Sequence, residues 1–336
     1  MTEAHGVTPW ASARFAARRS DPYHRCMEVS GFTFIRNAVK YDYPAVEAIR
    51  SVLPLVDEFV VNVGLLEGEP DDGTLELVRS IDDPRIRIIE SRWNPHLATG
   101  GYVYAQQTNV ALFNCQGKWA IYVQCDEVVH DEDYDILRDA MRQYADRADV
   151  DALMLWQRQF LGDYWTMLNV WPWTMRRKCW IVKPHHFVLS RGDAANFTVH
   201  PKFKERGRKI RAVQTAARQF HYCEVKTLKA LAAKRDNRHR FWAKGEDEVS
   251  DVLEDYYYQR FPKAFLARYE GAHPQVMARR MAEHPIRLDP ASPKWRARLT
   301  WKERRQLIKG WLVEHTTDRF TGRGDHVLVG EHRYQP

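Results

Sequence analysis

The chain has 336 residues, of which 44% are hydrophobic and 12% aromatic, and its formal net charge is +7. This composition allows one large domain, or one domain with a sizeable appendage. No apolar run approaches the roughly 18 residues of a membrane-spanning helix, and the N-terminal arginines are not followed by the apolar core of a secretory signal. The five cysteines form no Cys-x-x-Cys pair, so neither a disulfide framework nor a zinc ribbon is indicated. We expect a cytoplasmic protein with reduced thiols.

The first half of the chain alternates short β-branched and aromatic runs with segments of helical spacing. Strands are predicted at 31–36, 58–64 and 86–92, and helices at 43–56, 72–82 and 102–116. Strands that alternate with helices of this length favour a mostly parallel sheet with crossover helices. The sequence therefore predicts an α/β fold.

The next apolar run, residues 119–125, ends in two adjacent carboxylates, Asp126 and Glu127. The carboxyl end of a buried strand in an α/β sheet is where ligands bind, so acids at this position face a crevice. Acids in such a crevice usually hold a metal ion or a sugar. The alternative is that both residues begin the next helix, because Asp and Glu also favour the first turn.

A further strand is predicted at 152–160, and aromatic side chains are dense in the segment 164–180 that follows it. Aromatic faces stack on sugar rings and line acceptor grooves, but the same residues suit a packed core or a hydrophobic flap. Cationic side chains at 176–178 and 185–191 would add an electropositive rim, which suits an anionic lipid-linked or phosphorylated acceptor.

Positive charge is concentrated between His200 and Arg240, where thirteen Lys or Arg residues face three acids. Such a field attracts the phosphates of a nucleotide, a nucleic acid or an anionic lipid surface. The alternative is a solvated helical face.

The last third of the chain, from residue 225, shows apolar residues at three- and four-residue intervals and is punctuated by prolines. We expect helices that pack on the α/β domain or extend from it, as a soluble cap or in contact with a membrane face or another subunit. The predicted organisation is an N-terminal extension at 1–28, an α/β domain at 29–224 and a helical region at 225–336.

An ordered set of motifs resembles family 2 glycosyltransferases of the GT-A fold, and most closely the bacterial lipopolysaccharide and capsule branch. The set covers residues 29–135, with a weaker echo at 220–222. It consists of Arg36-Asn37 after the first strand, the strand 56–64, residues 71–74, residues 106–109, and the run 117–119 that leads into Asp126-Glu127.

This resemblance implies transfer of a sugar, with inversion, from a nucleotide-diphosphate donor to a saccharide or glycolipid acceptor in cell-surface polysaccharide biosynthesis. The enzyme would be cytoplasmic or peripheral at the inner face of the membrane. A divalent cation, Mn²⁺ or Mg²⁺, would neutralise the departing phosphate and would be held by Asp126 and His221. The donor would be bound by Arg36, Asn37, Asn62, Asp72, Asn109 and Gln124.

An inverting transfer needs a general base that takes the proton of the acceptor hydroxyl. The family places a carboxylate downstream of the metal motif, and the candidates in this chain are Asp163 and Asp193, each beside a glycine. Asp163 is slightly favoured because it directly follows a strand. Glu127 would bind the cation, the acceptor or a neighbouring loop.

The chain departs from the family pattern at several acidic positions. It has Gln124 and Asn62 where the family usually has aspartates, and Ala38-Val39 where acids usually follow the first-strand asparagine. Amides keep hydrogen bonding but lose charge, so metal affinity falls, donor preference shifts, or activity is lost.

Three alternative functions are considered. They are a catalytically silent glycosyltransferase-like domain that binds a nucleotide, a protein that binds nucleic acid through its basic stretch, and a nucleotidyltransferase. The nucleotidyltransferase is least supported because no Gly-rich phosphate loop follows the first strand.

Overall fold

The structure is a computed structural model that describes residues 28–97, 99–170, 177–201, 206–234, 255–315 and 326–335. The predicted N-terminal extension, apart from its last residue, and the tryptophans at 171 and 173 lie outside these ranges. No helix in the described ranges is long and apolar enough to cross a membrane.

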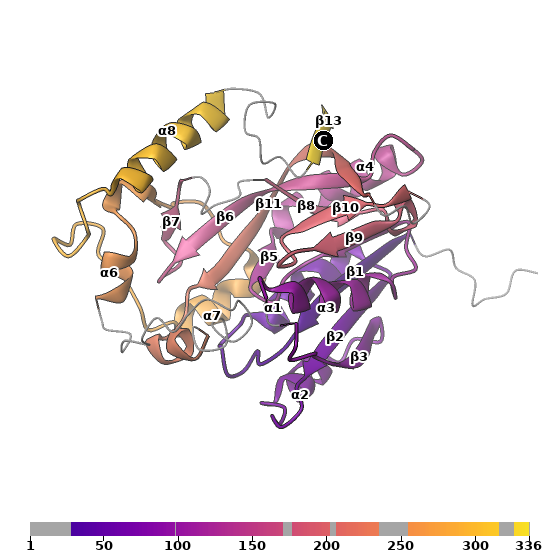
Figure 1. The fold of residues 1–336 in the computed structure, drawn as a ribbon, viewed down its shortest axis with the longest axis horizontal. Helices are drawn as coiled ribbons and strands as arrows, with labels where there is room; N and C mark the ends of the chain where they lie inside the picture. The colour runs from indigo at the N-terminus through magenta and orange to yellow at the C-terminus, as the bar shows by residue number, and fades with distance from the viewer. Residues whose placement is uncertain are drawn as a thin grey trace, which may run out of the picture.

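The first half of the chain forms one parallel sheet (Figure 1). Its strands follow the order β3-β2-β1-β4, with β1 at Val29–Ile35, β2 at Glu58–Leu65, β3 at Ile86–Arg92 and β4 at Trp119–Tyr122. The connections carry helices α1 (Ala45–Val52), α2 (Thr74–Arg79) and α3 (Tyr102–Leu112). The predicted alternation of strands and helices is therefore confirmed, and the fold is α/β with a mostly parallel sheet of GT-A type.

The sheet continues beyond β4 with strands from the second half of the chain. β8 (Arg177–Val182) pairs antiparallel with β4 and with β6 (Ala152–Leu161), and β6 pairs parallel with the long strand β11 (Arg208–Glu224). β10 (Asn196–Val199) pairs with β11, and β9 (Val188–Arg191) pairs with β10 and ends this side of the sheet. β7 (Thr166–Leu168) pairs with the end of β6. Residues 208–224 of the basic stretch are thus a strand of the sheet, and a solvated helical face is wrong for this part.

Glu127 does not begin a helix, because it opens a short strand, β5 (Glu127–Val129), that pairs antiparallel with β11. Helix α4 (Tyr134–Tyr144) starts only seven residues later. The pairing places Glu127 opposite His221, so two residues that are far apart in sequence lie side by side.

Ion pairs with acids of the fold neutralise much of the positive charge on β11. Arg208 and Arg211 both bind the buried carboxylate of Asp151, and Arg218 binds Asp133 and Glu132. These arginines therefore join β11 to neighbouring elements rather than forming an open basic surface.

The last third of the chain packs beside the sheet as short elements (Figure 1). Helices α6 (Tyr256–Arg260), α7 (Ala278–Glu283) and α8 (Trp301–His315) occur with two strands, β12 (Leu266–Arg268) and β13 (His326–Glu331), which pair with β7 and β11. Short 3-10 turns lie at Leu53–Leu55, Asp131–Asp133, Pro184–His186, Lys263–Phe265 and Gln275–Met277. The main core fills the space between the sheet and helices α1, α3 and α4, and a second apolar cluster around Phe261, Phe265 and Trp295 joins the last third to β7.

Candidate functional site

A cavity of about 430 Å³ opens at the carboxyl ends of β1 and β4. The ends of β1, β4 and β11 meet there with residues from β6 and from the last third of the chain. Its lining comprises Phe34, Arg36, Tyr41, Tyr43, Trp93, Tyr104, Gln124, Cys125, Asp126, Gln157, Gln159, Leu168, Lys178, Asp193, Ala195, His221, Cys223, Glu224, Lys234, Arg260 and Phe261. This is the edge of an α/β sheet at which ligands bind. The predicted boundary at residue 224 runs through the cavity, because Lys234, Arg260 and Phe261 come from beyond it.

Asp126 lies on the cavity wall between two cationic groups. Its Oδ1 is 3.4 Å from Nε2 of His221, and its Oδ2 is 3.6 Å from Nζ of Lys234. Burial acts to raise the pKa of Asp126, but the charges of His221, Lys234 and Lys226 outweigh it and hold the pKa well below its usual range. The carboxyl group is therefore ionised across the physiological pH range.

His221 is the partner predicted from the sequence for Asp126, and the structure brings the two side chains together. Its Nδ1 lies 2.8 Å from Nε2 of Gln157, and its Nε2 faces Asp126. Burial lowers the pKa of His221, but Cys223 and Asp126 more than compensate and raise it well above its ordinary value. Asp126 and His221 therefore form an ion pair at the cavity wall.

Two lysines beside Asp126 were not among the residues predicted from the sequence. Lys234 donates to the carbonyl oxygen of Cys223 (3.0 Å), and Lys226 donates to the carbonyl of Tyr41 (2.6 Å) and lies 3.9 Å from the ring centre of Tyr43. Burial, followed by the charge of Lys234, lowers the pKa of Lys226 to about 7. The only sequence signal for these residues was the basic stretch, which contains both but does not single them out.

Glu127 is fully buried behind the cavity and does not line it. Its Oε2 accepts hydrogen bonds from the backbone N–H of Gln124 (3.0 Å), Nε1 of Trp180 (2.8 Å) and Nε2 of Gln219 (2.8 Å). Burial raises the pKa of this carboxyl group. In this arrangement Glu127 holds the loop that carries Gln124 and Asp126.

Two of the six predicted donor-binding residues line the cavity. Arg36 pairs with Glu69, and its guanidinium lies 5.2 Å from the ring centre of Trp93. Gln124 donates through Nε2 to the carbonyl of Ala194 at 3.4 Å.

The other four are engaged within the fold and are not among the lining residues. Asn37 is buried and donates to the hydroxyl of Tyr41 (3.2 Å), and buried Asn62 donates to Gln107 (2.9 Å). Asp72 accepts from the backbone N–H of Lys40 (2.6 Å), and Asn109 donates to the carbonyl of Ser190 (2.9 Å). These contacts tie together the loops and helices around the strand ends.

Aromatic side chains that were not among the site residues predicted from the sequence form one wall of the cavity. Phe34 stacks on Tyr104 with ring centres 6.0 Å apart, and Trp93 meets Tyr104 edge-on at 5.6 Å. Gly64 at the end of β2 makes room for Trp93, because a Cβ at this position would lie 2.0 Å from the Nε1 atom of the indole. A glycine that ends a strand is the one sequence signal for this close approach.

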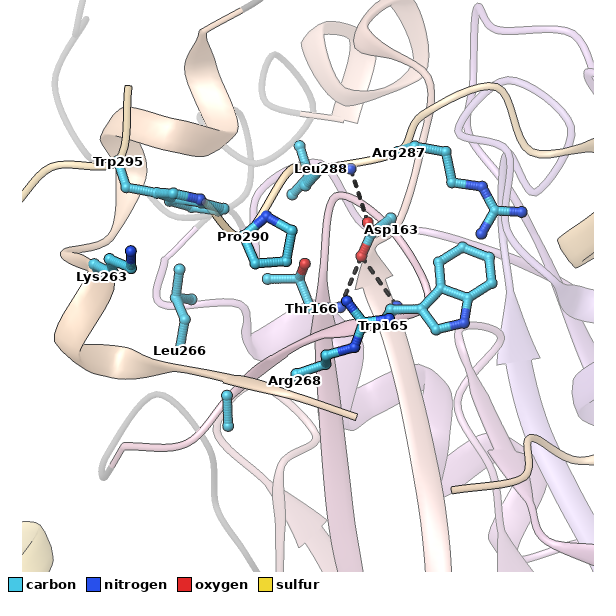
Figure 2. Close-up of a pocket in the computed structure, with 11 residues that line it drawn as sticks. Asp163, Trp165, Thr166, Lys263, Leu266, Arg268, Arg287, Leu288, Pro290 and Trp295 are labelled. Carbon is cyan, nitrogen blue, oxygen red and sulfur yellow. Dashed lines mark hydrogen bonds between the residues drawn. The ribbon is translucent and has the colours of Figure 1, made fainter. Parts of the chain in front are cut away.

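The two predicted bases lie in different places. Asp193 lines the same cavity as Asp126 and accepts a weak hydrogen bond from the N–H of Ala195 at 3.4 Å. Asp163 instead lies in a second pocket of about 400 Å³, where it accepts from the backbone N–H groups of Trp165 (3.0 Å), Thr166 (2.7 Å) and Leu288 (2.8 Å) (Figure 2). Both oxygens of Asp163 are thus used to hold the turn after β6 against the segment at 288.

The predicted metal ligands form an incomplete set. Within the ranges that the structure describes, no group of three or more His, Cys, Asp or Glu side chains is arranged to hold a metal ion. Asp126 Oδ1 and His221 Nε2 are an oxygen and a nitrogen donor 3.4 Å apart, which is close to the separation of two ligands on one cation of about 2.1 Å bond length. The pair fits an open site that a ligand would complete.

Several solved structures share part of the fold. S. aureus TarS 1–349, also solved in complex with UDP, matches with a TM-score of 0.30 and 20% identity over 47% of this chain and 47% of that chain. The mannosyltransferase PcManGT from Pyrobaculum calidifontis, solved in complex with GDP-Man and Mn²⁺, matches with a TM-score of 0.27 and 22% identity over 45% of this chain and 39% of its own. The chain thus spans less than half the length of each. No protein-family profile matches the sequence, and no curated protein does. Because the TM-scores and sequence identities of the structural matches are low, the function of the cavity is inferred from its own residues.

Proposed function

We propose that the chain is a glycosyltransferase that moves a sugar from a nucleotide-diphosphate donor to a saccharide or glycolipid acceptor in cell-surface polysaccharide biosynthesis. The observation that carries the proposal is the ionised Asp126 at the strand-end cavity, with His221 and Lys234 beside it at distances that leave the carboxylate open to a ligand.

Two groups of residues in the cavity wall would contact different parts of the proposed donor. The aromatic wall of Phe34, Trp93 and Tyr104 suits a flat nucleobase. Lys234, Arg260 and Arg36 line the same cavity, and a diphosphate would compete for them with their carboxylate partners Asp126, Glu224 and Glu69. A departing nucleoside diphosphate carries the charge that these groups would stabilise.

A divalent cation, Mn²⁺ or Mg²⁺, would be held by Asp126 and by His221 in its neutral form. When bound, it would act as a Lewis acid on the diphosphate. Gln157, which contacts Nδ1 of His221, would orient the imidazole. Binding of the cation would therefore compete with the proton on His221 and with the Lys234 ammonium.

Asp193 is proposed as the base, because it is the predicted base that lines the cavity with Asp126. Its carboxylate would take the proton of the acceptor hydroxyl as that oxygen attacks the anomeric carbon, and a single displacement inverts that carbon. Asp163 has both oxygens engaged by backbone N–H groups, so we assign it a structural role.

A thermal-shift panel tests the proposal directly. Nucleotide sugars and free nucleoside diphosphates are added with and without Mn²⁺, since ligands that bind the folded state raise the melting temperature. We expect at least one nucleotide sugar to raise the Tm more with Mn²⁺ than without it. Hydrolysis or transfer of that sugar then distinguishes an enzyme from a silent nucleotide-binding domain. A panel with no shift for any nucleotide, and a shift with RNA, would favour the nucleic-acid-binding alternative.

A further inference from the structure

Helix α8 exposes large apolar side chains to solvent. Trp301 is 75% exposed, Ile308 62%, Trp311 58% and Leu312 44%. Large apolar residues are normally scattered singly on a protein surface, and a contiguous patch marks an interaction site.

The four residues form one stripe along the helix. Residues seven and eleven positions apart lie within about 20° of each other around an α-helix, so Ile308 and Leu312 continue the line that Trp301 begins. Trp311 widens the stripe on one side. Four exposed cations lie within or beside this stripe, namely Lys302, Arg304, Arg305 and Lys309.

The opposite side of α8 is fixed to the protein, so the stripe cannot turn inward. Gln306 and Gly310 are buried, and Leu307 packs against the apolar cluster that contains Trp295 and Phe261. Glu303, in the first turn, is held by Arg296 at 2.6 Å. In Figure 1, α8 lies at the outer margin of the molecule, away from the sheet.

We propose that α8 binds the surface of a lipid bilayer that carries anionic headgroups. Tryptophan prefers the boundary between headgroups and acyl chains, and lysine and arginine reach from that depth to phosphate groups. A helix of 15 residues is about 22 Å long and lies in the plane of the interface rather than spanning the bilayer. Charge complementarity selects the lipid surface over a second copy of this chain, because two copies would bring the same cations face to face.

The site and the helix share one apolar cluster. Leu307 of α8 packs against this cluster, and Phe261 in the same cluster lines the candidate active-site cavity. Binding at α8 would therefore hold the cavity near the membrane surface, where a lipid-linked acceptor is located. Lipid binding itself is independent of the proposed transfer and is measured without donor or acceptor.

Cosedimentation of the full chain with vesicles tests this proposal. We expect binding to vesicles of phosphatidylglycerol and phosphatidylcholine, at least tenfold weaker binding to phosphatidylcholine alone, and loss of binding as salt is raised. The double variant W301S/I308S is expected to lose most binding. The variant F113S is the matched control, because Phe113 is 65% exposed at the end of α3, outside the stripe.

A second pair of variants separates charge from apolar contact. K302E/R305E is expected to lower the partition onto anionic vesicles by roughly tenfold or more and to leave the melting temperature close to that of the wild type. Unchanged vesicle binding by a folded W301S/I308S variant would overturn the proposal. So would equal binding to neutral and anionic vesicles, or a concentration-dependent dimer that W301S/I308S abolishes in a protein that binds no vesicles.

Discussion

Two buried carboxylates, Asp126 and Asp151, each lie among cationic side chains. The two carboxylates differ in the distance to these cations and in access to a cavity. Asp151 is fully buried and accepts hydrogen bonds from Nη1 of Arg208 (2.6 Å), Nδ1 of His186 (2.8 Å) and Nε of Arg211 (3.1 Å). Asp126 has its cations at 3.4 and 3.6 Å and faces a cavity. Asp151 is therefore saturated by the fold, whereas Asp126 has capacity for a ligand.

The pKa does not distinguish the two residues. In both cases burial acts to raise the pKa of the carboxyl group, and cationic neighbours overcome this effect and hold it well below its usual range. Contact distance and access to a cavity are what separate a structural ion cluster from a binding one. A perturbed pKa identifies a functional site only together with such geometry.

The largest effect on stability is expected for Asp151→Asn. This change leaves Arg208 and Arg211 beside a neutral group and weakens several charge-assisted hydrogen bonds to a buried side chain, which costs about 2–3 kcal/mol in the free energy of unfolding. Urea unfolding measures the loss. Nucleotide affinity of the folded fraction is expected to stay the same. A loss of nucleotide affinity at unchanged stability would reverse the roles assigned to the two clusters.

Asp126→Asn is expected to have the converse effect. Transfer should fall by about 10²–10³-fold, because the cation that would neutralise the departing diphosphate loses its carboxylate ligand, while the fold is largely kept. A transfer assay measures the first and urea unfolding the second. Asp149→Asn, which alters an exposed carboxylate beside Arg147, is the control and should retain activity. Normal turnover in Asp126→Asn would remove this residue from the mechanism.

The sequence predicted the first four strands of the sheet and the proximity of Asp126 and His221, because both depend on local periodicity and on motif order. It did not predict Lys234, Lys226 or Trp93 as site residues. Lys226 and Lys234 reach Asp126 only because the 17-residue strand β11 runs back to the strand ends, and a strand of this length was not apparent from a basic stretch. Asp163 has the same local sequence context as an active-site loop, and only the packing of the segment at 288 shows that its oxygens are occupied.

A variant of Lys226 tests whether the protonation state of this lysine beside Asp126 changes near neutral pH. Its pKa is lowered to about 7 in the folded protein, against roughly 10.4 when unfolded. Between these values the unfolded chain binds the proton and the folded chain does not, so the contribution of Lys226 to stability rises with pH. We expect the difference in unfolding free energy between wild type and Lys226→Met to rise by at most about 1.4 kcal/mol per pH unit from pH 7 to 9. A difference that is constant over this window would show that Lys226 has an ordinary pKa.

The smallest effect is expected for Gly64→Ala, which tests whether the aromatic wall of the cavity binds the nucleobase. In Gly64→Ala the new methyl group would lie 2.0 Å from Nε1 of Trp93, so the indole must move and the aromatic wall is distorted. We expect a loss of about 1 kcal/mol or more in the free energy of unfolding and a roughly tenfold weaker affinity for the nucleotide.

Gly330→Ala is the matched control, because a Cβ at Gly330 meets no atom within 4 Å. Isothermal titration of both variants with the best nucleotide from the thermal-shift panel measures the affinity, and Trp93→Phe should reproduce part of the loss. Asp151 is bonded by Arg208, Arg211 and His186, which are not part of this wall, so the further loss of unfolding free energy caused by Asp151→Asn should be the same in all three variants. Equal affinity in Gly64→Ala and Gly330→Ala would mean that the nucleobase does not use the aromatic wall, and the carboxylate cluster alone would then define the site.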